Sequence, residues 1–179
     1  MDYIVELIVT EDEAIQLVDK GSFRRLLQYL RPSLSDKDIP HHTKTRDEIL
    51  ERARLAVECV KEKLKHVDSK VSMTFDSWTS LTGDPFLSIT AHYIDSPADK
   101  PHEWELRTEQ LAFAPIDGNH SGSNIGRILI DTIDNYGIRN KVGWFTADNA
   151  TNNDTAIQTV AANIDPTAEE WDPVEHRVR

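Results

Sequence analysis

The chain has 179 residues, with 20 Lys and Arg against 31 Asp and Glu, and its formal net charge is −11. Its length fits one domain, or one domain with an appendage. The acidic balance argues against high-affinity binding of nucleic acid by this chain alone, because neutralising phosphates requires Lys and Arg. The mean hydropathy of −0.50 fits a water-soluble protein, and no apolar stretch is long enough to predict a membrane span.

The N-terminus and the single cysteine indicate the cellular compartment. The first residues, MDYIVELIVTEDE, are acidic where a signal peptide needs basic residues, so we expect no secretion. Cys59 has no second cysteine with which to form an internal disulfide. These features predict a reducing compartment, cytoplasmic or nuclear. Cys59 lies near the apolar face of a predicted helix, where we expect a small buried side chain.

The first third of the chain has a helical pattern. Residues 22–30 (SFRRLLQYL) place apolar side chains on one face at helical spacing, and Arg31-Pro32 ends this helix. Thr45 and Glu48 match the T-x-x-E capping box and predict the start of a second helix, which continues to about Leu64.

Two groups in this part are weak candidates for binding. Three arginines lie close together, and we favour a solvated helix face over a phosphate contact for them: Arg24, Arg25 and Arg31. The adjacent His41-His42 is expected to be a solvated loop rather than a metal site, because neighbouring side chains in an extended segment point apart.

From residue 71 the apolar period changes from helical to alternating. Three strands are predicted over 71–78 (VSMTFDSW), 86–94 (FLSITAHYI) and 104–113 (WELRTEQLAF), and their short connections favour an antiparallel meander. A helix follows within 118–138, with Gly137 as its C-terminal cap. Residues 141–148 (KVGWFTAD) then form a more continuously apolar fourth strand, which is typical of the interior of a sheet.

The order of elements predicts an α/β fold with a mixed sheet. An N-terminal helical segment (1–68) precedes a β-β-β-α-β-α core (69–165), whose last helix follows the fourth strand. The final residues, 166–179, contain two prolines and an acidic run, and we expect them to form an exposed connector.

This topology brings two carboxylates to one edge of the sheet. A right-handed crossover returns the fourth strand beside the first and parallel to it. Asp76 lies near the end of the first strand and Asp148 at the end of the fourth. Two hard oxygen ligands suit Mg²⁺ or Mn²⁺ and phosphoryl transfer on nucleic acid. The alternative to a metal site is a structural role for the second acid. In that case Asp148-Asn149, together with Asn152-Asn153, forms a turn and caps the next helix.

Four sequence blocks in order resemble the transposases of the hAT superfamily. They are VSMTFDSWTS, FLSITAHYID, HSGSNIGRILIDTI and FTADNATNND, and the resemblance extends over about residues 15 to 179. It implies an RNase H-like fold, so that 69–165 is part of a catalytic core. Asp76 matches the first acid of the family's Asp-Asp-Glu triad and Asp148 the second. His120 and Gly122 match the H-x-G that opens the family's helix.

The resemblance also implies a function and partners. Members of the family cleave and transfer DNA strands at transposon ends with Mg²⁺ or Mn²⁺, in the nucleus, and their full-length forms are possible homo-oligomers. In the family the catalytic Glu lies farther along the chain than the part that residues 1–179 match, so we expect this chain alone to be inactive.

Trp78 lies two residues after Asp76, and we expect it to be a core or rim residue rather than one that stacks on DNA bases. The alternative function is a degenerate or domesticated relative that acts as a non-catalytic DNA- or protein-interaction module.

Overall fold

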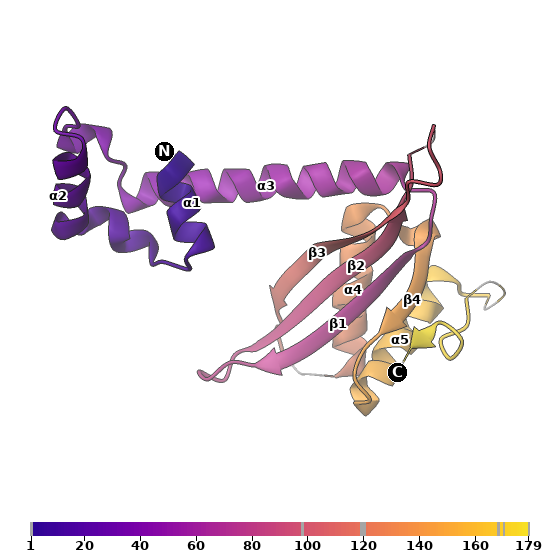
Figure 1. The fold of residues 1–179 in the computed structure, drawn as a ribbon. Helices are drawn as coiled ribbons and strands as arrows, with labels where there is room; N and C mark the ends of the chain where they lie inside the picture. Colours follow the sequence, from indigo (N-terminus) through magenta and orange to yellow (C-terminus); the bar gives the residue numbers. More distant parts are fainter. Residues whose placement is uncertain (1, 98, 119–120, 168, 170, 179) are drawn as a thin grey trace. The chain divides into compact units, whose positions relative to one another are not determined.

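The computed structural model describes residues 2–97, 99–118, 121–167, 169 and 171–178 (Figure 1). The chain divides into two units, Met1–Glu58 and Cys59–Arg179, which are called the N-terminal and C-terminal units below. The division lies inside one long helix, ten residues before the predicted boundary at 68/69. Among the described residues, no helix is both long and apolar enough to cross a membrane.

The N-terminal unit is helical, as predicted. Its elements are α1 (Asp2–Thr10), the 3₁₀ turn η1 (Ile15–Asp19), α2 (Gly21–Leu30), the 3₁₀ turn η2 (Asp36–Asp38) and the first part of α3 (His42–His66). The helix predicted over 22–30 is confirmed as α2. The capping box predicted at Thr45 and Glu48 is wrong, because α3 begins three residues earlier. Thr45 is buried inside the helix, and its Oγ1 donates a hydrogen bond to the carbonyl oxygen of His41.

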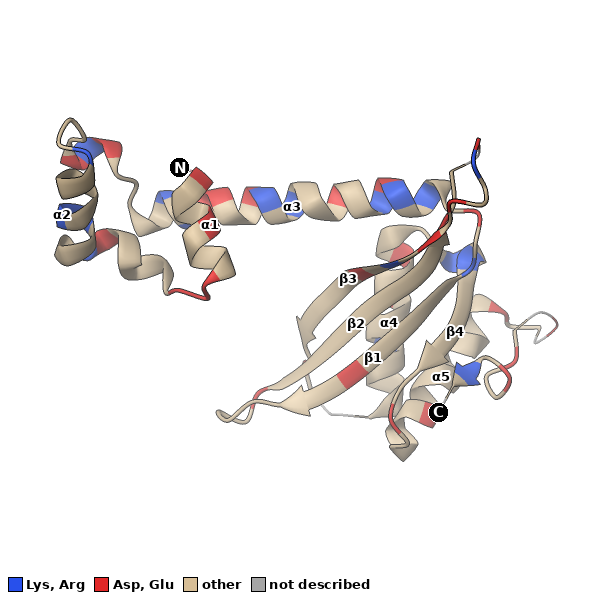
Figure 2. Cartoon of the chain, viewed as in Figure 1, with Lys and Arg blue, Asp and Glu red and all other residues tan. Residues whose placement is uncertain are grey.

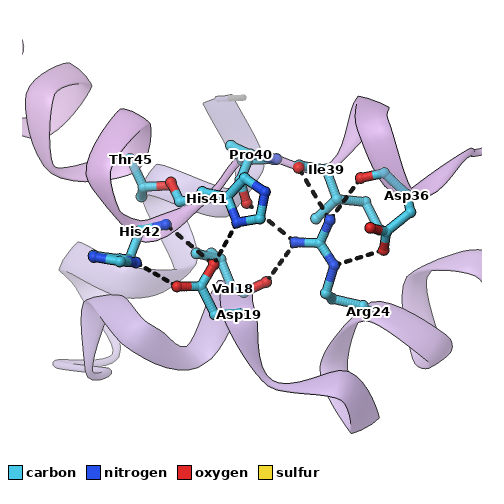
Figure 3. A network of polar contacts seen from close by, with 9 residues as sticks. All are labelled: Val18, Asp19, Arg24, Asp36, Ile39, Pro40, His41, His42 and Thr45. Atoms are coloured by element: carbon cyan, nitrogen blue, oxygen red, sulfur yellow. Dashed lines mark hydrogen bonds and ion pairs between the residues drawn. The ribbon is translucent and has the colours of Figure 1, made fainter.

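Arg24 is a buried structural residue of this unit (Figure 3). Its Nε donates to Oδ1 of Asp36 (2.7 Å), and its Nη2 donates to the main-chain oxygen of Asp36 (2.6 Å). Its Nη1 donates to the carbonyl oxygen of Val18 (2.9 Å). Both roles considered for Arg24 in the sequence, a solvated helix face and a phosphate contact, are therefore wrong. The guanidinium satisfies carbonyl groups of the loop that wraps around it, which is why it is buried despite its charge.

Asp19 joins the start of α3 to η1 (Figure 3). Its Oδ1 lies 3.1 Å from Nδ1 of His41 and accepts the backbone N–H of His42, and its Oδ2 contacts Nδ1 of His42. Both histidines are exposed, as predicted, but they are paired with this carboxylate, and His42 belongs to α3 rather than to a loop. The N-terminal cap of α3 therefore comes from a residue 23 positions upstream.

The contacts of Asp19 predict a pH dependence of the N-terminal unit. Partial burial raises the pKa of Asp19, but the hydrogen bonds from His42 and His41 outweigh it, so the pKa lies below its ordinary value. A carboxyl with a lowered pKa stabilises the fold above its unfolded pKa, and this stabilisation is lost as the pH falls through the folded pKa. At neutral pH the N-terminal unit of Asp19→Asn should be less stable than that of the wild type. Below about pH 4 the variant should lose less stability than the wild type does. Amide NMR signals recorded during an acid titration measure both effects. The exposed Asp47→Asn serves as the control, and an unchanged acid profile for Asp19→Asn would contradict the assignment.

The C-terminal unit contains a five-stranded mixed sheet in the order β3-β2-β1-β4-β5. The strands are β1 (Val71–Thr79), β2 (Pro85–Asp95), β3 (Glu105–Pro115), β4 (Val142–Thr146) and β5 (Arg177–Val178). β1, β2 and β3 pair antiparallel, and β4 pairs parallel with β1. The predicted meander and the predicted return of the fourth strand beside the first are both confirmed. The fold is α/β and RNase H-like.

Two helices, α4 (Gly122–Tyr136) and α5 (Thr151–Ile164), cover one face of this sheet (Figure 1). Val71, Met73 and Phe75 of β1 are buried, and they alternate with side chains of the opposite face. The predicted cap at Gly137 is confirmed, with a φ of 65°, the left-handed conformation that glycine adopts without strain. The core consists of apolar side chains from α4, α5 and the sheet, among them Leu87, Ile89, Leu129, Ile133, Phe145, Ile157 and Val160.

Two expectations about exposure differ from the structure. Cys59 is exposed rather than buried. Residues 166–179, expected to be an exposed connector, are mostly exposed where they are described, but Trp171 is buried. Trp171 is 6% exposed, its Nε1 donates to the carbonyl oxygen of Gly143 (3.1 Å), and its ring meets that of Phe145 edge-on. The segment then adds β5 beside β4. The polar composition of the segment did not predict this packing, because the packing depends on one indole and two strand residues.

Candidate metal site at the carboxyl edge of β1 and β4

The parallel pairing of β1 with β4 sets the positions of both predicted acids. Thr74 and Thr146 are directly paired, and Asp76 and Asp148 each follow two residues later. Because side chains alternate along a strand, Asp76 lies on the same face as Thr74, the face opposite α4 and α5. β4 ends at Thr146, so the loop between β4 and α5 sets the orientation of Asp148. The pairing thus assigns both acids to the same edge of the sheet.

Asp76 presents its carboxylate to solvent. It is an exposed residue inside β1 and is paired across the sheet with Ser88 of β2. Within the described ranges its carboxylate has no hydrogen-bond or ion-pair partner. Both carboxylate oxygens therefore remain available to an external ligand.

Asp148 has a local structural role in addition to any ligand role. Its Oδ1 accepts the backbone N–H of Ala150 (3.1 Å) and Nδ2 of Asn153 (2.6 Å). The predicted alternative, in which Asp148 forms a turn before the next helix, therefore accounts for the contacts of Oδ1. The other, Oδ2, contacts no hydrogen-bond donor in the part of the chain that the structure describes. One oxygen shapes the turn, and the second is left for a ligand.

Asn153 and Arg177 contact Asp148; the sequence suggested Asn153 only as part of a turn and helix cap, and it did not single out Arg177. Asn153 is 6% exposed and lies in the first turn of α5. The Arg177 side chain is 4% exposed; its Nη2 donates to the main-chain oxygen of Asp148 (3.0 Å), and the guanidinium pairs with Asp154 of α5. The signal for Asn153 was the run TADNATNND. Nothing local in HRVR distinguishes Arg177 from a solvated charge.

Gly122 of the H-x-G motif has a packing role, whereas His120 lies outside the described residues. Gly122 is the first residue of α4, directly after the N-cap Ser121. A Cβ built on Gly122 would lie 2.2 Å from the carbonyl oxygen of Asn152 and 2.5 Å from Cβ of Thr155. Only glycine allows α4 to approach the start of α5 this closely. The contact fixes the helix that directly follows the Asp148 loop.

Trp78 lies at the rim of the sheet, as predicted. Its ring contacts those of Phe86 (6.1 Å between centroids) and Phe113 (5.2 Å), and 39% of the residue is exposed. The strands around this cluster carry few charges, and most Lys and Arg residues lie on α2, on α3 and in connecting segments (Figure 2). The charge pattern around the two acids therefore provides no basic track for a phosphate backbone.

The oxygen donors of Asp76 and Asp148 suit the divalent metal that the resemblance implies. Carboxylate oxygens at the edge of a sheet are ligands that Mg²⁺ and Mn²⁺ accept, and Asp76 and Asp148 together offer at least three oxygens without a protein donor. Across the described residues, no group of three or more His, Cys, Asp or Glu side chains is placed to hold a metal ion. The two acids fit part of a metal site, whose remaining ligands would have to be water, substrate or other residues.

Comparison with known proteins agrees with the fold and with the order of the motifs. The family model of ZBED1 RNase-like domains matches residues 74–172, more than half of the chain, and this range includes Asp76 and Asp148. A Talaromyces stipitatus protein described as the transcriptional regulator tpeD is 25% identical over 164 residues, which are 92% of this chain and 19% of that protein. No solved structure gives a significant match.

Two Zea mays proteins described as the AC and AC9 transposases are each 24% identical over 160 residues, 89% of this chain. The matched part is 19% of the AC protein and 18% of the AC9 protein, so the chain spans about a fifth of the length of these relatives. These matches confirm the resemblance to hAT-type transposases, and the chain belongs to the family of ZBED1 RNase-like domains.

Proposed function

We propose that this hAT-like core supplies two metal-binding carboxylates, Asp76 and Asp148, for the cleavage and transfer of DNA strands. The observation that carries the proposal is the parallel pairing of Thr74 with Thr146, which assigns both acids to one edge of the sheet. Exposure of Asp76 and the unoccupied Oδ2 of Asp148 support it. When bound there, Mg²⁺ or Mn²⁺ would stabilise the attacking and leaving oxygens of a phosphodiester.

The chain's own contribution is to hold the carboxylates. The chain spans about a fifth of its relatives' length, and by analogy with the family we propose transposon-end DNA as a partner, a nuclear location and homo-oligomerisation. The acidic net charge agrees with a core that offers metal ligands rather than a phosphate-binding surface of Lys and Arg. Two carboxylates without the third acid should not support efficient catalysis.

One observation favours a second function, a non-catalytic interaction module. A relative that covers 92% of this chain is described as a transcriptional regulator. In addition, Oδ1 of Asp148 already has a structural role in the turn before α5. If the fold has been kept without the chemistry, both acids remain as surface or turn residues and bind no metal.

Calorimetric titration with Mn²⁺ separates the two functions. We expect the wild-type chain to bind Mn²⁺ and Asp148→Asn to lose that binding, since the substitution removes a charged ligand. We also expect no efficient metal-dependent nicking of supercoiled DNA by this chain alone. Absence of Mn²⁺ binding in the wild type would favour the interaction module. Nicking that is lost in Asp76→Ala would show that the two acids suffice and would refute the expected inactivity.

A further inference from the structure

The loop that carries Asp148 is held by side chains from both sides. From α5, the buried Asn153 reaches back to Oδ1 of Asp148 at 2.6 Å and to its main-chain oxygen at 3.4 Å. From β5, the buried side chain of Arg177 donates to the same main-chain oxygen at 3.0 Å. Oxygens of one aspartate thus receive donors from residues 5 and 29 positions later in the sequence.

The position of Arg177 follows from the pairing of β5 with β4. Arg177 is paired with Phe145, whose backbone N–H donates to the carbonyl oxygen of His176 (2.8 Å). Phe145 is fully buried, so Arg177 lies on the face of the sheet that α5 covers, and its guanidinium pairs there with Asp154. The ion pair compensates the positive charge of Arg177, which would otherwise weaken the attraction of a cation to Asp148. Arg177 therefore links β5, α5 and the Asp148 loop.

We propose that Asn153 and Arg177 are positioning residues for Asp148, and that they direct its Oδ2 toward a divalent cation shared with Asp76. The inference rests on the proposed function. Its physical basis is pre-organisation: a carboxylate on a free loop must be ordered when it binds a cation, whereas hydrogen bonds to Oδ1 and to the main chain order it beforehand. Arg177 therefore belongs to the site as a positioning residue rather than as a ligand.

The test measures the dissociation constant of Mn²⁺ by electron paramagnetic resonance, at a temperature where circular dichroism shows each variant folded. Asn153→Ala and Arg177→Met should raise it about 10- to 100-fold, the range typical of lost outer-shell partners. Arg177→Lys should recover much of the affinity, because it keeps the charge and one donor.

Arg139→Met is the matched structural control. Arg139 also bridges two segments, from Asp134 (Nη2 to Oδ2, 2.6 Å) to Asn163 (Nη1 to the carbonyl oxygen, 3.1 Å), but it does not contact Asp148. Its loss should lower thermal stability and leave the affinity for Mn²⁺ unchanged. A merely structural role of Arg177 would give the same pattern as Arg139.

The outcomes separate this inference from the proposed function. Mn²⁺ binding that is lost in Asp148→Asn but unchanged in Asn153→Ala and Arg177→Met would overturn the positioning role alone. No binding by the wild type would overturn the proposed function and, with it, this inference. If both variants fail to fold, Asp154→Asn decides, because it removes the ionic partner of Arg177 and changes a side chain that is 43% exposed. A several-fold weaker affinity supports the inference, and an unchanged one refutes it.

Discussion

Replacing Asp76 by Asn should weaken the binding of Mn²⁺ by more than about 100-fold, since even the loss of an outer-shell partner typically costs about 10- to 100-fold. Asp76 is exposed and has no protein partner among the described residues, so the substitution removes a ligand without removing an internal contact. The thermal stability of the chain should therefore change little. Titration calorimetry and thermal unfolding of the same sample measure both effects.

Two comparisons exclude a nonspecific effect of charge. Asp131→Asn removes one negative charge from an exposed position of α4, and it should leave the affinity for Mn²⁺ nearly unchanged at physiological ionic strength. The double variant Asp76→Asn with Asp148→Asn should bind hardly more weakly than either single variant, because ligands of one cation are strongly coupled. Equal losses in Asp76→Asn and Asp131→Asn would mean that the −11 net charge, rather than a site, attracts the cation.

Gly122→Ala should destabilise the C-terminal unit by about 3 kcal/mol, the upper part of the range for overpacked sites. The added methyl group would meet the main-chain oxygen of Asn152 at 2.2 Å, and main chain cannot turn aside as a flexible side chain can. Urea denaturation followed by tryptophan fluorescence measures the change in the free energy of unfolding. All four tryptophans of the sequence lie after residue 58, so the signal reports on this unit.

A neighbouring substitution controls for helix propensity. Ser123→Ala lies at the next position of α4, is exposed and adds no clash, so it should change stability by less than about 0.5 kcal/mol. If Gly122→Ala proves as mild as Ser123→Ala, the close approach of α4 to α5 is not what requires glycine in the H-x-G motif.

The alternation of apolar and polar residues and the turn-forming residues predicted the sheet, because both signals depend only on neighbouring positions in the sequence. Val71, Met73 and Phe75 alternate with polar residues, and Gly137 ends α4 in the conformation that its position requires. The parallel return of β4 followed from one general rule on crossover connections, and it brought Asp76 and Asp148 to the same edge.

The features that the sequence did not predict depend on contacts over long distances in the chain. The true start of α3 is capped by Asp19, whereas Thr45 and Glu48 matched a capping motif by chance. Arg24 is buried only because the loop through Asp36 folds around it. In each case the local pattern was compatible with a solvated residue or an ordinary cap, and tertiary contacts decided otherwise.

The end of the chain illustrates the same limit at the candidate site. Prolines and acidic residues in 166–179 are typical of a connector, yet Trp171 inserts beside Phe145 and Arg177 reaches Asp148. Composition averages over a segment, while a single buried indole or guanidinium is enough to fix it. Topology predicted that Asp76 and Asp148 lie at one edge of the sheet. The run TADNATNND suggested the turn at Asn153, whereas the contact of Arg177 with Asp148 was not predictable.

Crystals of this chain soaked in Mn²⁺ test the central claim most directly, through the anomalous scattering of the metal. The account predicts a single strong peak with carboxylate oxygens of both Asp76 and Asp148 within about 2.0–2.6 Å, the range of metal–oxygen bonds for such cations. A peak bonded to only one of them, or two carboxylates directed to opposite faces of the sheet with no metal between them, would contradict it.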